Sequence, residues 1–200
     1  MRKYLSVLCV GLSVLVLAGC AEPPALEIDQ ARAAVSGAET AQAAQYAPDA
    51  LRAARDAQAQ LDAELKAQEE RFALMRSYDK AKELAAAAQA SGEKAAADAR
   101  AGKERARQEA SSAISAAQTS LAEVKVLLDQ APTGKGTAAD LAAMRGDLAA
   151  VDEALIGADS SFAAEKFAEA KTAAEAAMQT VEATRAEIEQ AIAATKGRRR

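Results

Sequence analysis

Carboxylates are the most abundant residues in this 200-residue sequence that could do chemistry, and histidine is absent. Some acids are neighbours in the sequence: Glu69 with Glu70, which Glu64 precedes, and Asp152 with Glu153. Such acids could serve acid–base catalysis only if burial in a shaped cleft shifted their pKa values. Scattered among Lys and Arg, such acids more often form the solvated face of a helix. Without histidine, a three-His zinc site, a Ser-His-Asp triad and a Glu-x-x-His di-metal site cannot form. We therefore expect no enzymatic activity, no metal and no cofactor.

A second group of candidate residues ends an apolar segment near the N-terminus: Leu17-Ala18-Gly19-Cys20. Arg2 and Lys3 precede the segment as a positive region. The apolar run from Leu5 to Ala18 has about 14 residues, which is too short to span roughly 30 Å of hydrocarbon. The sequence therefore predicts that residues 1–19 are a signal peptide.

The residues before Cys20 resemble the lipobox of bacterial lipoproteins. The resemblance implies diacylglycerol transfer to the Cys20 thiol, cleavage between Gly19 and Cys20, and acylation of the new amino terminus. Cys9 leaves with the signal peptide, so the mature chain keeps no thiol for a disulfide. Several acyl chains on one residue are sufficient for stable anchoring. Ala21 stands where an Asp would favour inner-membrane retention, so we expect an outer-membrane anchor that faces the periplasm. An ordinary secretory signal with an incidental cysteine is the alternative.

The composition predicts an all-α protein. The chain has 58 alanines, 3 % aromatic residues and no tryptophan, so it lacks the β-branched and aromatic residues that a sheet needs. Alanine and the other strong helix formers dominate instead. Residues 20–25 contain Pro23-Pro24 and are predicted to be an extended tether. We expect an Ala-rich helical bundle or a coiled-coil-like arrangement after it.

An internal repeat at an offset of 90 residues predicts two tandem three-helix units. The units are expected at 26–100 and 108–196, with a helical linker at 101–107 and a basic tail at 197–200. The matched pairs are Leu51/Leu141, Ala53/Ala143, Arg55/Arg145, Ala59/Ala149, Asp62/Asp152 and Leu65/Leu155.

Prolines and glycines predict where the chain reverses. Reversals are expected after Gln45, after Gln130 and at Gly157–Ser161. The equivalent reversal in the first unit is expected near Lys66–Ser77, with a single helix over 49–130 as the alternative. Residues between Leu84 and Ile114 include no large apolar side chain, which predicts a solvated helical bridge or a frayed linker.

Apolar residues step by three or four positions and predict the seams between helices. One charged residue, Arg185, interrupts the last seam. The seam residues are Ile114, Leu121, Val124 and Leu128; Leu141, Leu148, Val151 and Leu155; and Phe167, Ala170, Ala174, Met178, Val181, Ile188 and Ile192.

Aromatic and basic residues are too few to indicate a ligand site. Tyr78 and Phe167 occupy equivalent positions in the repeat, and we expect them, with Phe72 and Phe162, to fill the ends of the bundles rather than to stack on a ligand. Basic residues cluster only at 103–107 and 196–200. The net charge of −4 and the pI of about 5.1 argue against nucleic acid as a partner.

A helix end at Ala-Pro, followed by Leu-x-x-Ala and Tyr-x-x-Ala spacing, forms a recurring pattern in residues 26–100. Its positions are Ala47, Pro48, Leu51, Ala54, Leu61, Leu65, Tyr78, Ala81, Leu84 and Ala88. With these positions the segment resembles the envelope proteins of the domain of unknown function 4398 family. The resemblance implies a helical module that faces the periplasm, with no established activity.

Together these features predict a lipid-anchored cell-envelope protein of structural or adaptor type, held to the membrane by its N-terminal lipid. An envelope protein or peptidoglycan is a possible partner. One alternative is an oligomeric coiled coil similar to murein lipoprotein, although that class usually ends in a lysine and this chain ends in Arg200. The other is a helical scaffold that binds a periplasmic protein or peptidoglycan.

Overall fold

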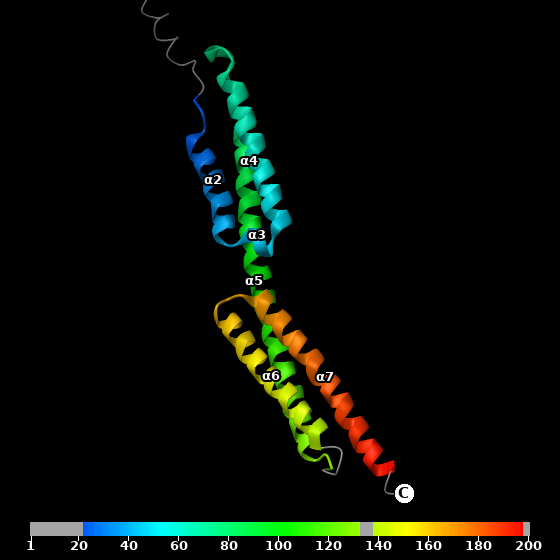
Figure 1. Cartoon of the computed structure of the whole chain (residues 1–200). Coiled ribbons are helices and arrows are strands. Elements are labelled where there is room, and N and C mark those ends of the chain that lie inside the picture. The colour runs from blue at the N-terminus through cyan, green and yellow to red at the C-terminus, as the bar shows by residue number, and fades with distance from the viewer. Residues whose placement is uncertain (1–21, 133–137, 198–200) are drawn as a thin grey trace, which may run out of the picture. The chain divides into compact units, whose positions relative to one another are not determined.

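Every regular element that the structure describes is helical, which confirms the all-α prediction (Figure 1). The structure is a computed structural model that describes residues 22–132 and 138–197. Its packing divides the chain into two units between Lys103 and Glu104, inside the segment predicted as a linker. The helices are α2 (Ala25–Thr40), α3 (Ala43–Tyr46), α4 (Pro48–Glu69), the 3-10 turn η2 (Ala73–Met75), α5 (Asp79–Asp129), α6 (Ala138–Ala163) and α7 (Phe167–Gly197).

The first unit packs α2, α4 and the N-terminal part of α5 around two small clusters of buried side chains. One cluster, at the end where α2 and α5 begin, contains Ile28, Leu61 and Tyr78. The other lies near α3 and contains Val35 and Leu51. Alanine supplies most of the remaining buried positions in both clusters. Because alanine is small, each buried position contributes little apolar area, and the helices must approach closely to exclude water.

The prediction of a solvated segment between Leu84 and Ile114 is wrong for its first half. Ala95 and Ala99 are fully buried against α2 and α4. At Gly92 the backbones of α5 and α2 are so close that an added Cβ would lie 2.7 Å from the carbonyl carbon of Ala34. The absence of large side chains therefore marks close helix packing here, not exposure.

The second unit packs the C-terminal part of α5 with α6 and α7 around one continuous core. The seams predicted from the sequence form this core, with Met178 and Ile192 partly buried at its border. Its large buried members are Ile114, Leu121, Val124, Leu128, Leu141, Met144, Leu148, Val151, Leu155, Phe167, Val181 and Ile188.

The chain folds back between α4 and α5, within the Lys66–Ser77 segment, and the alternative of one helix over 49–130 is wrong. No glycine or proline makes this turn. The amide oxygen of Gln68 accepts a hydrogen bond from the Ser77 amide at 3.1 Å, and the guanidinium of Arg76 donates to the carbonyl oxygens of Glu69 and Arg71 at 2.9 and 3.1 Å. The Arg76 side chain thus pairs carbonyl groups at and just after the end of α4, and the Gln68 side chain pairs an amide just before α5.

The reversal predicted at Gly157–Ser161 is wrong, because α6 continues through these residues to Ala163. The Ser160 hydroxyl donates to the Ile156 carbonyl inside the helix, and the neighbouring Leu155 and Ala158 stay buried. The chain turns instead at Glu165, whose φ is 58°. The Lys166 amide donates to Ser161 and the Glu165 amide to Phe162, the pattern of a Schellman cap.

Candidate functional site

The predicted lipidation and cleavage residues, Cys20 and Gly19, lie outside the described residues, as do the rest of the signal peptide and Arg198–Arg200. The described chain starts at Glu22. Helix α2 begins at Ala25, five positions after Cys20, and Pro24 precedes it as its buried N-cap residue. The helical part of the chain therefore starts almost directly after the predicted acylation site.

The repeated acids Asp62 and Asp152 make the same kind of contact in the two units. Asp62 on α4 accepts a hydrogen bond from Arg32 on α2 at 3.0 Å, and Asp152 on α6 accepts one from Lys125 on α5 at 2.5 Å. All four side chains are about half exposed, where such pairs typically contribute about 0–1 kcal/mol. The two acids therefore connect the first two helices of each unit.

The other candidate acids lie on the outside of the helices. Glu69, Glu70 and Glu153 are exposed, and the half-buried Glu64 accepts a hydrogen bond from Gln68 at 2.7 Å. Their positions agree with the solvated-face interpretation of the sequence.

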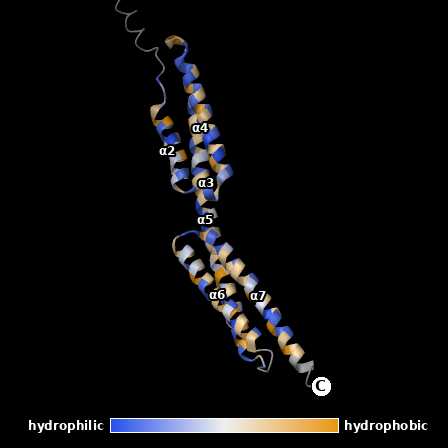
Figure 2. Cartoon of the chain, viewed as in Figure 1, coloured by the Kyte–Doolittle hydropathy of each residue, from blue (hydrophilic) through white to orange (hydrophobic). Residues whose placement is uncertain are grey.

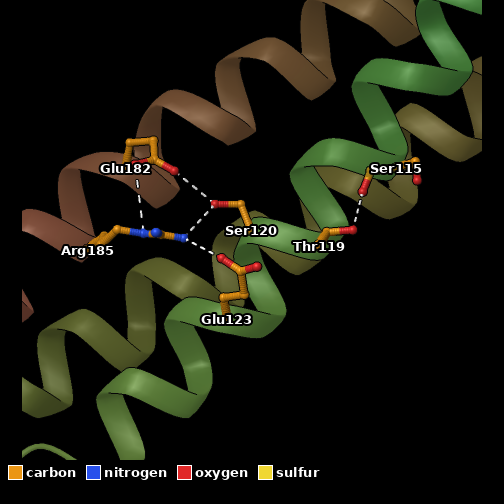
Figure 3. A network of polar contacts seen from close by, with 6 residues as sticks. All are labelled: Ser115, Thr119, Ser120, Glu123, Glu182 and Arg185. Atoms are coloured by element: carbon orange, nitrogen blue, oxygen red, sulfur yellow. Dashed lines mark hydrogen bonds and ion pairs between the residues drawn. The ribbon is translucent and has the colours of Figure 1, made fainter.

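The densest polar network of the described residues joins α5 to α7 in the second unit (Figure 3). Arg185 on α7 donates to the Ser120 hydroxyl at 3.2 Å and to the Glu123 carboxylate at 2.9 Å. Ser120 in turn donates to Glu182 at 2.9 Å. Arg185 Nε is buried without a hydrogen bond and lies 3.8 Å from Glu182 Oε2. The hydrogen bond with Glu123 raises the pKa of Arg185 above its usual value, so the guanidinium stays charged.

An open groove of about 770 Å³ runs beside this network. The Ser120 hydroxyl already donates to one carboxylate and accepts from Arg185, and Arg185 is shared between two carboxylates. The polar groups of the network therefore bond to one another and hold α7 to α5 at the point where Arg185 interrupts the apolar seam. The groove is lined by Ser111, Ser112, Ser115, Ala116, Thr119, Ser120, Glu123, Met178, Glu182 and Arg185.

A second contact between α5 and α7 lies toward the start of the unit. The Lys171 ammonium donates to Glu109 at 2.8 Å, which lowers the pKa of Glu109 and raises that of Lys171. On α5 itself, hydrogen bonds from Arg107 and Gln108 lower the pKa of the exposed Glu104 to about 2. These carboxylates are charged at neutral pH, which favours ion pairing over proton transfer.

Three of the four aromatic residues predicted to fill the ends of the bundles lie there. Tyr78 and Phe167 are buried, and Phe162 is partly buried with its ring centroid 5.3 Å from that of Phe167. The prediction for Phe72 is wrong, because its side chain is 70 % exposed. Phe72 lies within the turn between α4 and α5, and it belongs to none of the buried clusters in the described part of the chain.

The described residues contain no group of acids or cysteines arranged to hold a metal ion. None of the helices in the described part of the chain combines the length and hydrophobicity needed to cross a bilayer. Comparison of the chain with protein-family models, curated proteins and solved structures found no match. The resemblance of residues 26–100 to the domain of unknown function 4398 family therefore depends on its motif residues alone.

Sequence reasoning missed two features of the structure. The Ser120–Glu182–Arg185 network was signalled only by the charge that interrupts the last seam. The exposed apolar side chains between α4 and α5 are those of Phe72, Leu74 and Met75. In the sequence, the only sign of their exposure is that they do not continue the three-and-four spacing of the neighbouring seams.

Proposed function

We propose that this chain is a lipid-anchored cell-envelope protein of structural or adaptor type, held to the outer membrane through acylated Cys20 and facing the periplasm. The observation that carries the proposal is the lipobox-like Leu17–Cys20 directly before a tether and a helical body that begins at Ala25. The described part of the body presents paired and solvated charges, which suit a binding or spacing role. The motif resemblance of residues 26–100 to an envelope family supports the same proposal.

Replacing Cys20 by Ser tests the anchor. The change removes the thiol that an acyltransferase would alkylate, so the precursor should stay uncleaved and should no longer partition into the detergent phase. Cys9→Ser is the matched control, because it removes a thiol from the predicted signal peptide and leaves Cys20 in place. Its processing and partitioning should match the wild type. Detergent partitioning of Cys20→Ser equal to that of Cys9→Ser would exclude the lipoprotein proposal.

The packing of the seams favours a structural or adaptor role over an oligomeric coiled coil. The seam residues of α7, such as Val181 and Ile188, are fully buried against α5 and α6 of the same chain. An oligomer similar to murein lipoprotein would need these seams to pair between chains. Light scattering of the mature protein separates the two, since the internal seam predicts a monomer. A pull-down from envelope extract and from purified peptidoglycan then identifies the partner class.

A further inference from the structure

Three large apolar side chains are exposed in the turn between α4 and α5, at one end of the first unit. Phe72 is 70 % exposed, Leu74 66 % and Met75 74 %. We call these three residues the apolar tip. Figure 2 shows the hydrophobic colour at the turn between α4 and α5 and at the start of α2. An exposed group that includes an aromatic ring usually marks a surface that something covers.

The apolar tip lies at the end of the unit where the chain arrives from Cys20. Ile28, in the first turns of α2, shares a buried cluster with Tyr78 at the start of α5 and with Leu65 near the end of α4. The turn between α4 and α5 therefore lies at the same end as the N-terminus of α2 (Figure 1).

The turn is built to hold these side chains outward. Its polar groups are satisfied within the turn: Gln68 accepts from the Ser77 amide, Arg76 donates to two carbonyl oxygens, and the Met75 amide donates to the Phe72 carbonyl at 2.8 Å. A surface turn usually exposes polar side chains and keeps apolar ones beneath it. Here Phe72, Leu74 and Met75 are exposed together with the polar side chains, while backbone hydrogen bonds hold the turn.

The length of the tether determines what can cover the tip. Between Cys20 and Ala25 the fully extended chain spans at most about 17 Å, so an acylated Cys20 holds this end of the unit close to the bilayer. The charges around the turn balance, with Glu69 and Glu70 against Arg71 and Arg76, so the surface favours an apolar contact over an electrostatic one.

We propose that the apolar tip inserts into the surface of the lipid bilayer as a second membrane contact beside the acylated Cys20. The inference rests on the proposed lipid anchor. Phe, Leu and Met side chains at this position resemble the apolar face of an interfacial segment, which lies roughly 5–10 Å into the boundary between headgroups and acyl chains. The contact would fix the first unit by two points and would limit its rotation about the tether.

The chain contains no tryptophan, so a single substitution gives an unambiguous fluorescence reporter. Phe72→Trp places it in the tip at a 70 % exposed position, where folding should be unaffected. Gln45→Trp is the matched control, because Gln45 is exposed at the opposite end of the first unit, beside the cluster that contains Val35 and Leu51. Each full-length variant is purified from cells and reconstituted into phosphatidylcholine vesicles with plain or brominated acyl chains.

In both kinds of vesicle the emission of Phe72→Trp should move to shorter wavelength, and in brominated vesicles it should also be weaker than in plain ones, as expected for a ring at interfacial depth. Gln45→Trp should show neither change. Adding Leu74→Asp to Phe72→Trp should restore the emission, because a buried carboxylate opposes insertion.

Vesicle flotation, measured on the same samples, tests the anchor separately. Protein that floats while Phe72→Trp stays unquenched overturns the inference and leaves the lipid anchor intact. Quenching of Phe72→Trp in protein that carries no lipid supports the tip contact and overturns the anchor. Emission that shifts to shorter wavelength without quenching shows that protein, not lipid, covers the tip, and this also overturns the inference.

Discussion

At the scale of single residues, small side chains control this fold more than large ones do. Alanine supplies most of the core of the first unit, and glycine allows α5 to approach its neighbours at two positions. At Gly92 an added Cβ would meet the backbone of Ala34 at 2.7 Å, and at Gly102 it would meet the carbonyl oxygen of Tyr46 at 2.5 Å. Backbone atoms cannot move aside as a flexible side chain can, so both contacts require glycine.

Gly92→Ala should therefore destabilise the protein although alanine is the better helix former. Overpacking of this kind costs about 1–3 kcal/mol. Gly37→Ala in α2 is the control, because nothing lies within 4 Å of its added Cβ. It should stabilise the protein by about 0.5–1 kcal/mol. Urea unfolding of the two variants measures both free energies, and a stabilised Gly92→Ala would show that α2 and α5 are less tightly packed than the structure has them.

The ion pair between Glu109 and Lys171 should make the second unit sensitive to acid. The Lys171 hydrogen bond lowers the pKa of Glu109 below its ordinary value of 4.5. A lowered pKa in the folded state contributes stability above the unfolded value, and this contribution is lost as the pH falls through the folded value. Lys171→Met should thus lower stability slightly at pH 7, and its difference from the wild type should shrink below pH 4.5.

Urea unfolding at pH 7 and at acid pH measures this difference. Lys80→Met is the control, because Lys80 pairs with Glu83 three positions along the same helix and joins no second helix. A Lys171→Met effect that is constant across the acid range would assign the loss to packing of the lysine stem.

At the scale of the elements, the sequence predicted what depends on periodicity and missed what depends on context. The three-and-four spacing of Leu, Val and Ile correctly predicted the seams of the second unit. Gly157 signalled a helix end that does not exist, because buried Leu155 and Ala158 hold α6 together at a glycine that costs only about 1 kcal/mol. The chain turns instead at Glu165, whose backbone is in the left-handed region. A glycine at this position would have indicated the turn in the sequence, whereas a glutamate does not.

Leu61 and Leu74 provide a direct test of the fold-back between α4 and α5. Leu61 is fully buried between helices of the first unit, whereas Leu74 is 66 % exposed in the turn. Leu61→Asp should cost on the order of 3 kcal/mol or more, because it buries a charge without a partner. Leu74→Asp should change stability by less than about 0.5 kcal/mol. Thermal unfolding followed by circular dichroism measures both, and equal effects would contradict the helical hairpin.

At the scale of the whole molecule, the chain consists of two helical units that bury their own seams. The repeat at an offset of 90 residues is visible in the structure, where Leu51 and Leu141 are each 2 % exposed and Asp62 and Asp152 each join the first two helices of a unit. The 51-residue helix α5 supplies its N-terminal part to the first unit and its C-terminal part to the second. Because each unit has its own core, the seams of each unit are buried without a second chain.

The second unit should therefore fold by itself. A chain of residues 104–200 retains the whole core that joins α5, α6 and α7. It should unfold in one cooperative thermal transition with an enthalpy of about 60 kcal/mol, the usual value for a domain of this size. Calorimetry at two protein concentrations measures the enthalpy and the midpoint together. Because the seam closes within one chain, the midpoint should be independent of concentration. A midpoint that rises with concentration would show that the seams pair between chains, and a gradual loss of helicity would show that this unit depends on the first.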